Sequence, residues 1–275
     1  MSDESFKPLR SLDNAELNAD LAAKLNANAS WKHLIANKKM SVGLVDISDP
    51  YNIRYASVNG EEMMYAASLP KIAVLLATMD AFEKNEINET AELDADLKNM
   101  ISHSNNTSAS RFINLCGLNK IQKVLTDPKY MLYDQDHGGG LWVGKCYAGS
   151  GARNPDPMKG LSHAATAAEV CNFYYMMAMG KLISPERSSE MLSIMDNPAL
   201  HHKFVSTLDK IAPGAHVYRK SGTWANWHSD SVMVWGEGRK YILVALIEDP
   251  AGESIIRSLV QPMESVLKIN ASAHS

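Results

Sequence analysis

The chain has 275 residues, of which 45% are apolar and 21% charged, and its formal net charge is −4 at pH 7. This composition is typical of a globular protein with one large domain or two small ones. The slight acidity argues against a nucleic-acid partner, because phosphate binding needs an excess of basic residues. No apolar run approaches the roughly 20 residues of a membrane-spanning helix. Three cysteines, Cys116, Cys146 and Cys171, form neither a metal motif nor a disulfide framework, and we expect free thiols.

The first elements along the chain are a helix and two strands. Leucines recur every four residues within 11–37, which predicts a helix over this range. Residues 40–47 and 53–58 have strand character, and the sequence Ser48-Asp49-Pro50 between them favours a turn.

From about residue 60 the pattern becomes helical. Residues 72–82 are almost entirely apolar, which predicts a buried helix rather than a surface helix. Further helices are predicted over 94–102, 107–118, 166–179 and 185–195. Residues 127–162 are rich in glycine and show little periodicity, so we expect a long structured loop there. Loops of this length inside a compact domain are usually functional.

Strand patterns return near the C-terminus. They are predicted over 217–223, 231–235 and 241–247, and the last of these is an unbroken apolar run that suits a central strand. A final helix is predicted over 253–267, with Pro262 kinking or restarting it.

This order of elements predicts an α/β (α+β) fold. The strands at both ends of the chain can form one antiparallel five-stranded sheet flanked by the terminal helices, with an inserted all-helical part. We assign 1–59 and 206–275 to a discontinuous sheet-and-helix subdomain and 60–205 to a helical subdomain. The cleft between the two is the expected ligand site.

A serine and a lysine stand one helical turn apart where the buried helix begins. The sequence is Ser68-Leu69-Pro70-Lys71, and Pro70 suits a first turn. Lys71 can therefore reach the Ser68 hydroxyl, and burial can lower its pKa enough to make it a base. The alternative is a serine helix cap followed by a surface lysine. That alternative is disfavoured because the helix leaves Lys71 no exposed face.

Two further motifs follow in the chain. Ser104-Asn105-Asn106 precedes a predicted helix and by itself would be explained as a helix cap. Lys220-Ser221-Gly222-Thr223 lies on a predicted strand, where Lys220 and Gly222 share one side. Gly222 would leave room for a substrate backbone, although a strand end with a turn residue has the same pattern.

The motifs S-x-x-K, S-x-N and K-S/T-G, in this order, resemble those of the penicillin-recognising serine hydrolases. These are the class A β-lactamases and the penicillin-binding D,D-peptidases. The resemblance extends from about residue 20 to 270 and is closest to the class A β-lactamase fold.

The resemblance implies catalytic roles for four residues. Ser68 is the acylated nucleophile, and Lys71 is its base or proton relay. Ser104 passes a proton to the leaving nitrogen, while Lys220 supplies positive charge near Ser104 and the substrate carboxylate.

The resemblance also implies how substrate is bound. Asn106 holds the substrate amide, and the backbone N–H groups of Ser68 and Thr223 form the oxyanion hole beside Gly222. The hydroxyl of Ser221 or Thr223 binds the substrate carboxylate.

The expected partner is a small β-lactam or peptide-like molecule, with no metal and no organic cofactor. A monomer is favoured. The resemblance implies a periplasmic or secreted protein, but the N-terminal sequence lacks a signal-peptide pattern. We therefore expect either a signal removed before this numbering begins, or a cytoplasmic location if the sequence is complete.

Three features depart from the class A pattern. Ser104 follows Ser68 by only 36 positions, and Asn105 stands where class A usually has Asp. Class A enzymes carry a loop Glu that activates the deacylating water, whereas residues 119–162 contain no Glu. Seven residues are candidate replacements: Asp127, Asp134, Asp136, His137, Asp156, His163 and Glu169.

A general base contributes roughly 10²–10⁴ in rate, so its loss predicts slow deacylation. We predict a serine hydrolase with β-lactam hydrolysis as its leading activity. The alternatives are a D,D-peptidase or related amidase or esterase, and a protein that binds β-lactams without turning them over.

Overall fold

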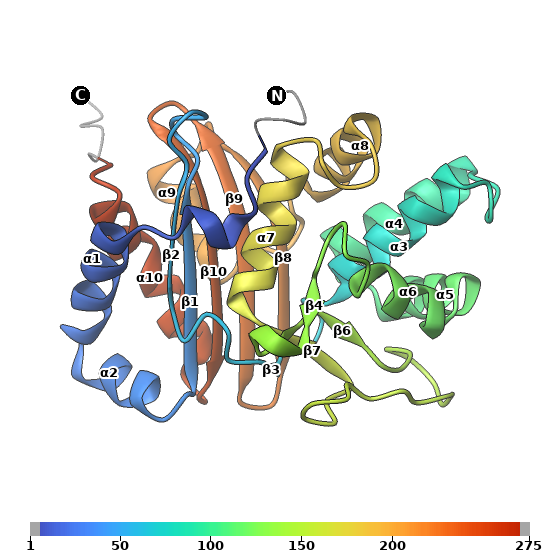
Figure 1. The fold of residues 1–275 in the computed structure, drawn as a ribbon, viewed down its shortest axis with the longest axis horizontal. Helices are drawn as coiled ribbons and strands as arrows, with labels where there is room; N and C mark the ends of the chain where they lie inside the picture. The colour runs from blue at the N-terminus through green and yellow to red at the C-terminus, as the bar shows by residue number, and fades with distance from the viewer. Residues whose placement is uncertain (1–5, 270–275) are drawn as a thin grey trace.

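The computed structural model describes residues 6–269, and its centre is a five-stranded antiparallel sheet (Figure 1). The strand order is β2-β1-β10-β9-β8. The strands are β1 (Met40–Asp46), β2 (Arg54–Val58), β8 (His216–Trp224), β9 (Trp227–Gly236) and β10 (Arg239–Glu248). These match the five predicted strands, and the predicted fold class is confirmed. The strand predicted over 231–235 is longer, because β8 and β9 stay paired up to the Trp224–Trp227 turn.

Helices cover both faces of the sheet. The terminal helices α1 (Ala15–Asn26) and α10 (Gly252–Val266) lie on one face with α9 (Phe204–Ile211), and α7 (Ala167–Ala178) packs on the other (Figure 1). Side chains of β10 alternate between the two resulting cores: Leu243 and Ala245 face the terminal helices, whereas Ile242 and Val244 face the opposite core. The seven-residue apolar run is thus explained by a strand buried on both faces.

The terminal helices differ from their predictions in detail. The single helix predicted over 11–37 is two helices, α1 and α2 (Ala29–Ala36). Asn28 separates them, because its side chain accepts hydrogen bonds from the first backbone N–H groups of α2. A 3₁₀ turn, η2 (Leu9–Leu12), precedes α1. Pro262 does not restart the last helix, because it lies inside a continuous α10.

The remaining helices surround α3 (Lys71–Glu83), which is buried from Lys71 to Phe82, as predicted. Its neighbours are α4 (Ala91–Ser102), α5 (Asn106–Cys116), α6 (Leu118–Leu125) and α8 (Pro185–Met195). The helix predicted over 107–118 ends at Gly117, whose φ of 79° breaks it. α6 and α9 were not predicted, since each is only eight residues long.

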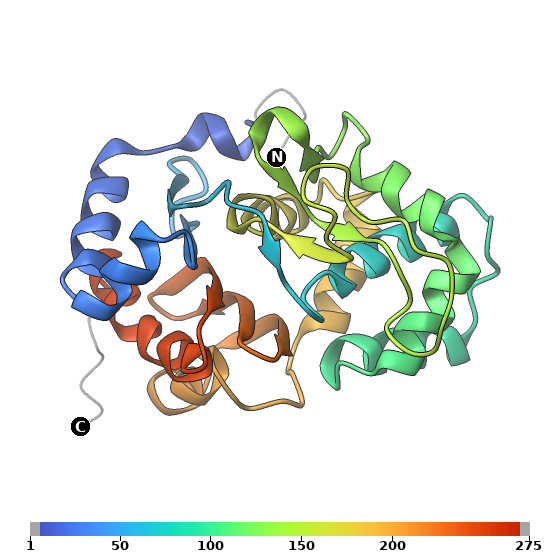
Figure 2. The ribbon, with the colours of Figure 1, turned by 90° about the horizontal axis from the view of Figure 1, so that it is seen from below.

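The predicted loop at 127–162 contains short ordered elements. These are β4 (Tyr133–Asp134), η3 (Gln135–His137), β5 (Gly139–Gly140) and β6 (Trp142–Val143). A second sheet of order β3-β7-β6 joins the loop to β3 (Met64–Tyr65) and β7 (His163–Ala165). Figure 2 shows this small sheet and its loop between the terminal helices and α4–α6. The loop is therefore held close to the turn that leads into α3.

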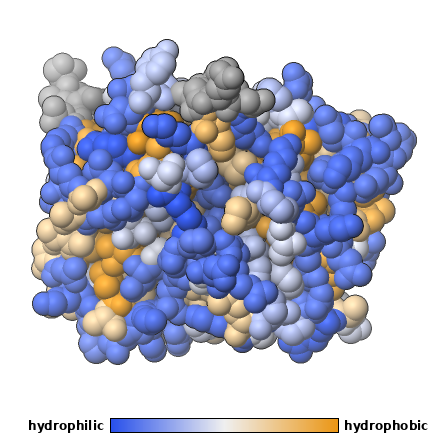
Figure 3. Space-filling model, viewed as in Figure 1, coloured by the Kyte–Doolittle hydropathy of each residue, from blue (hydrophilic) through white to orange (hydrophobic). Residues whose placement is uncertain are grey.

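The surface view in Figure 3 is largely hydrophilic, with apolar side chains in small, separated groups. Within residues 6–269, no helix combines the length and the apolar character needed to cross a bilayer. α7 belongs by sequence to the predicted helical subdomain but contacts β1 and β10. The division into two subdomains stays a prediction.

Candidate functional site

A cavity of about 560 Å³ lies where the turn before α3, the loop after β6 and the β8–β9 turn meet. Ser68, Asn106 and Thr223 from the three motifs line it. Lys71 and Lys220 lie beneath it and are buried, with at most 1% of their surface exposed. Three segments that are far apart in sequence therefore meet at one place.

Ser68 is half-buried in the turn that precedes α3. Its carbonyl oxygen accepts a hydrogen bond from the Lys71 N–H (3.2 Å), and Pro70 is the N-cap residue of α3. Ala67, immediately before Ser68, has a φ of 50°, a conformation that costs energy for any residue other than glycine. Within residues 6–269 the Ser68 hydroxyl makes no hydrogen bond, so it is available to a ligand in the cavity.

The Lys71 amine is held by the second motif rather than by Ser68. Its Nζ donates to the carbonyl oxygen of Ser104 (2.6 Å) and to Oδ1 of Asn106 (2.7 Å), and lies 3.4 Å from the Ser104 hydroxyl. No carboxylate pairs with it among the described residues. Burial lowers the pKa of Lys71 to about 7. A neutral amine is therefore well populated near neutral pH, as a general base requires.

Ser104 lies between two buried lysines. Lys220 Nζ donates to the Ser104 hydroxyl (2.9 Å) and to the carbonyl oxygen of Ser221 (2.8 Å). Burial, followed by the nearby charge of Lys71, holds the pKa of Lys220 well below its usual range. Ser104 has a φ of 57°, and Asn105 after it is the N-cap of α5. The helix-cap explanation is thus correct for Asn105, whereas Asn106 contacts Lys71.

Gly222 allows β8 to approach the turn that carries Ser68. A Cβ atom on Gly222 would lie 2.3 Å from the Ala66 carbonyl oxygen and 2.6 Å from the Ser68 nitrogen. The Ser229 hydroxyl, on the neighbouring strand, donates to the same Ala66 oxygen (2.8 Å). The close approach is therefore to the protein's own backbone. Ser221 is buried and does not line the cavity, unlike Thr223.

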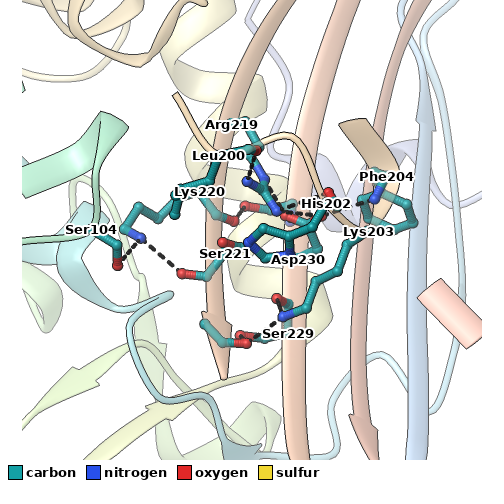
Figure 4. Close-up of polar contacts among 12 residues, drawn as sticks. Ser104, Leu200, His202, Lys203, Phe204, Arg219, Lys220, Ser221, Ser229 and Asp230 are labelled. Atoms are coloured by element: carbon teal, nitrogen blue, oxygen red, sulfur yellow. Dashed lines mark hydrogen bonds and ion pairs between the residues drawn. The ribbon is translucent and has the colours of Figure 1, made fainter. Parts of the chain in front are cut away.

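A buried lysine that was not predicted lies behind the third motif. Lys203 Nζ donates to the Gly222 carbonyl oxygen (2.6 Å), to the Thr223 hydroxyl (2.8 Å) and to the Ser229 carbonyl oxygen (3.0 Å). Figure 4 shows Lys203 extending toward Ser229 and Lys220 extending toward Ser104. Burial lowers the pKa of Lys203 to about 8. No local sequence pattern marks this lysine, because all three acceptors belong to other elements.

A buried ion pair links β8 and β9 close to the third motif. Arg219 donates to both carboxylate oxygens of Asp230 (2.8 and 3.1 Å), and both residues are almost fully buried. Asp230 also accepts from the backbone N–H groups of Phe204 and Ser231. Since every charge in this network has partners, it orders β8, β9 and the start of α9 together (Figure 4).

Of the seven candidate replacements for the missing loop Glu, His163 alone lines the cavity within the described part of the chain. Its Nε2 faces the Lys145 carbonyl oxygen (3.1 Å), which can only accept, so Nε2 carries the proton. Nδ1 then accepts from the Ser162 hydroxyl (3.3 Å). Burial lowers the pKa of His163 to about 4, so the ring is neutral at pH 7 with both nitrogens occupied.

Two of the acidic candidates, Asp156 and Glu169, have structural contacts elsewhere. Asp156 organises the loop by accepting from three backbone N–H groups and from the Tyr133 hydroxyl. Glu169 lies in a separate cavity of about 160 Å³, where its carboxylate accepts from Arg10 (2.6 Å) and Asn172 (3.0 Å). Its backbone N–H is capped by Thr166, as the capping-box pattern T-x-x-E indicates. Within residues 6–269, no three His, Cys, Asp or Glu side chains gather to hold a metal ion.

The chain is similar to known proteins in sequence and in fold. A family model described as "Beta-lactamase enzyme family" matches residues 21–96 and 93–263, which is most of the chain. No curated protein matches the chain in sequence. Many solved structures share its fold.

A β-lactamase from Sphaerobacter thermophilus is 16% identical, with a TM-score of 0.68, and the match covers 92% of this chain and 98% of that one. PBP-A is also 16% identical, with a TM-score of 0.67 and coverage of 93% and 97%. A PBP-A mutant, solved as an acyl-enzyme complex with penicillin G, is 19% identical, with a TM-score of 0.65 and coverage of 96% and 99%. At these identities the similarity establishes a shared fold.

Proposed function

Because the chain belongs to the beta-lactamase enzyme family, we propose that it is a serine hydrolase that works through an acyl-enzyme on Ser68. The observation that supports this most directly is the placement of two buried lysine amines around Ser104, next to the cavity lined by Ser68. A buried lysine without a carboxylate partner is costly to maintain, and such groups are concentrated at functional sites.

In the proposed acylation step, the Ser68 hydroxyl attacks the carbonyl carbon of a substrate amide or ester. Lys71, in its neutral form, accepts the hydroxyl proton. Ser104 gives its hydroxyl proton to the leaving nitrogen of an amide, or to the leaving oxygen of an ester, and takes a proton from the Lys71 ammonium in return. The C–N or C–O bond breaks as the acyl-enzyme forms. Lys220 donates a hydrogen bond to Ser104 and orients its hydroxyl for this transfer.

Substrate binding is proposed to use Asn106, Thr223 and Ser221 around the nucleophile. Asn106 holds the substrate amide, and the backbone N–H groups of Ser68 and Thr223 stabilise the oxyanion. The tight packing of Gly222 against the Ser68 nitrogen keeps β8 next to the turn that carries Ser68. The Thr223 hydroxyl is the better candidate for the substrate carboxylate, because Thr223 lines the cavity. Lys203 is a positioning residue that fixes Thr223 from behind.

The leading activity is hydrolysis of β-lactams, with deacylation as the slow step. None of the described residues that line the cavity is Asp or Glu, so a carboxylate base for the deacylating water is missing there. This observation also favours a second candidate function, a protein that is acylated by β-lactams and does not turn them over. A D,D-peptidase, amidase or esterase would use the same residues with another acyl donor. We also propose that the cleft lies between a sheet-and-helix subdomain, 1–59 with 206–275, and a helical subdomain, 60–205.

The decisive experiment follows the intact mass of the protein over time after penicillin is added. A hydrolase with slow deacylation gives an adduct of one penicillin that decays over minutes to hours. An adduct that never decays identifies the non-turnover protein. The Ser68→Ala variant is expected to give no adduct. Ser162→Ala is a matched control, since Ser162 lines the same cavity and should be dispensable for labelling. Labelling that survives in Ser68→Ala and disappears in Ser162→Ala would overturn the assignment of the nucleophile.

A further inference from the structure

One wall of the Ser68 cavity is a row of aromatic rings from four separate segments. Trp227 on β9 contacts Tyr65 edge-on (centroids 6.2 Å apart), and Tyr65 contacts His163 of β7 in the same way (6.3 Å). Tyr147, from the loop, lies against His163 (4.1 Å). All four residues line the cavity. Because successive rings pack on one another, the wall is a continuous apolar surface rather than a set of isolated side chains.

The row is fixed relative to the nucleophile. The Tyr147 hydroxyl donates to the Ala67 carbonyl oxygen (3.2 Å), next to Ser68 in the chain, and the Tyr147 ring centroid lies 4.6 Å from the Lys71 amine. Tyr65 precedes the same turn. A group that rests on the rings is therefore close to the carbonyl that Ser68 would attack, where the acyl part of a substrate must lie.

The one charged side chain among the described residues that line the cavity is positive. His163 is neutral at pH 7, and the described residues lining the cavity include Lys145 but no Asp or Glu. The Lys145 amine makes no ion pair or hydrogen bond with any residue of 6–269. Burial lowers the pKa of His163, and the positive charge of Lys145 contributes in the same direction. A positively charged acyl group would meet no acidic partner and would be repelled by Lys145.

We propose that this aromatic row is the acyl-binding wall and selects acyl donors whose acyl group is flat, apolar and free of positive charge, an arylacetyl group being the simplest example. The proposal rests on the proposed acyl-enzyme function of Ser68. It names Trp227, Tyr65 and Tyr147 as specificity residues and Lys145 as the residue that rejects cationic acyl groups.

The test compares penicillins that share one nucleus and differ only in the acyl group: phenylacetyl, α-aminophenylacetyl, α-carboxyphenylacetyl and acetyl. The second-order rate constant of acylation is measured for each by intact mass or stopped flow. We expect the phenylacetyl compound to react about tenfold faster than the ammonium-bearing and acetyl compounds. The carboxylate-bearing compound should remain within about threefold of the phenylacetyl compound, because Lys145 tolerates negative charge.

Three variants assign the effect to residues. Trp227→Ala should slow the phenylacetyl compound by about three- to tenfold more than it slows the acetyl compound. Trp235→Ala is the matched control: Trp235 lies on the same strand and is 39% exposed, but it does not line the cavity. Lys145→Gln should reduce the discrimination against the ammonium-bearing compound to less than about threefold.

Equal acylation rates for all four acyl groups would overturn the proposal that the aromatic row selects the acyl group. The proposed acyl-enzyme on Ser68 would still stand. If none of the four compounds forms an adduct, the proposed function fails instead. The wall is then still tested by calorimetry, because the reversible affinities of the Ser68→Ala variant for the four compounds must follow the same order. A flat order in that measurement would also overturn the proposal.

Discussion

Gly222 on β8 faces the backbone of Ser68 so closely that a Cβ atom on Gly222 would lie 2.6 Å from the Ser68 nitrogen. Real Cβ atoms do not approach a backbone nitrogen to this distance, so the two segments can meet only when position 222 is glycine. The S-x-x-K turn and the K-S/T-G strand are thus joined by a steric requirement as well as by their proposed chemistry.

Gly222→Ala should separate β8 from the Ser68 turn. We expect acylation by penicillin to fall by more than about 100-fold and the free energy of unfolding to fall by about 1–3 kcal/mol, as in other overpacked sites. Acylation kinetics and urea unfolding measure the two effects. Gly214→Ala is the control, because a Cβ there meets no atom within 4 Å. Normal acylation by Gly222→Ala would show that the close approach is not needed for the reaction.

The rate of acylation should depend on pH through Lys71. Burial lowers the pKa of this amine to about 7, so the neutral base form is lost as the pH falls below 7. The second-order rate constant of acylation should therefore rise about tenfold per pH unit up to pH 7 and level off above it. Measurement from pH 5 to pH 9 provides the profile. Lys71→Arg should be slow and flat over this range, because a guanidinium does not lose its proton. A flat wild-type profile would exclude Lys71 as the base.

Lys203→Met should lower the stability of the protein and its affinity for penicillin, although Lys203 is not expected to contact the substrate. The substitution leaves the Gly222 carbonyl, the Thr223 hydroxyl and the Ser229 carbonyl without their shared donor. We expect a loss of about 1–3 kcal/mol in the free energy of unfolding. Reversible penicillin binding should weaken more than the acylation step slows, because Thr223 faces the cavity. The exposed Lys210 on α9 provides the control Lys210→Met, which should change neither quantity. If Lys203→Met bound penicillin with the affinity of the wild type, the proposed positioning role of Lys203 would be wrong.

Glu169→Ala should lower stability and leave deacylation unchanged. Glu169 is buried in a cavity that Ser68 does not line. It accepts from Asn172 and is one of two carboxylate partners of Arg10, the other being Glu61. Since Arg10 is itself about a third exposed (32%), we expect a loss of about 1–3 kcal/mol rather than the full cost of an unpaired buried charge. The lifetime of the penicillin adduct, followed by intact mass, should equal that of the wild type. A markedly longer lifetime would identify Glu169 as the deacylation base.

Much of the fold could be predicted because most of its helices and strands show a hydrophobic pattern in their local sequence. The apolar run in β10 and the nearly all-apolar α3 follow from burial on every side, which is visible in local sequence. The short helices α6 and α9 could not be predicted, since eight residues give too few turns for a clear period and their stability comes from packing. The break between α1 and α2 depends on one side-chain cap, Asn28, within a continuous helical pattern.

The sequence by itself determined which residue types stand in the three motifs, their order, and the burial of Lys71 on an apolar helix. Only the tertiary structure decided that Lys203 supports Thr223 and that Tyr65, His163 and Trp227 form one wall. It also separated Glu169 from the Ser68 cavity. The physical reason is the range of the interactions: helix and strand periods arise from neighbours in the chain, whereas a buried amine finds its acceptors, and a ring its packing partners, wherever distant segments happen to meet.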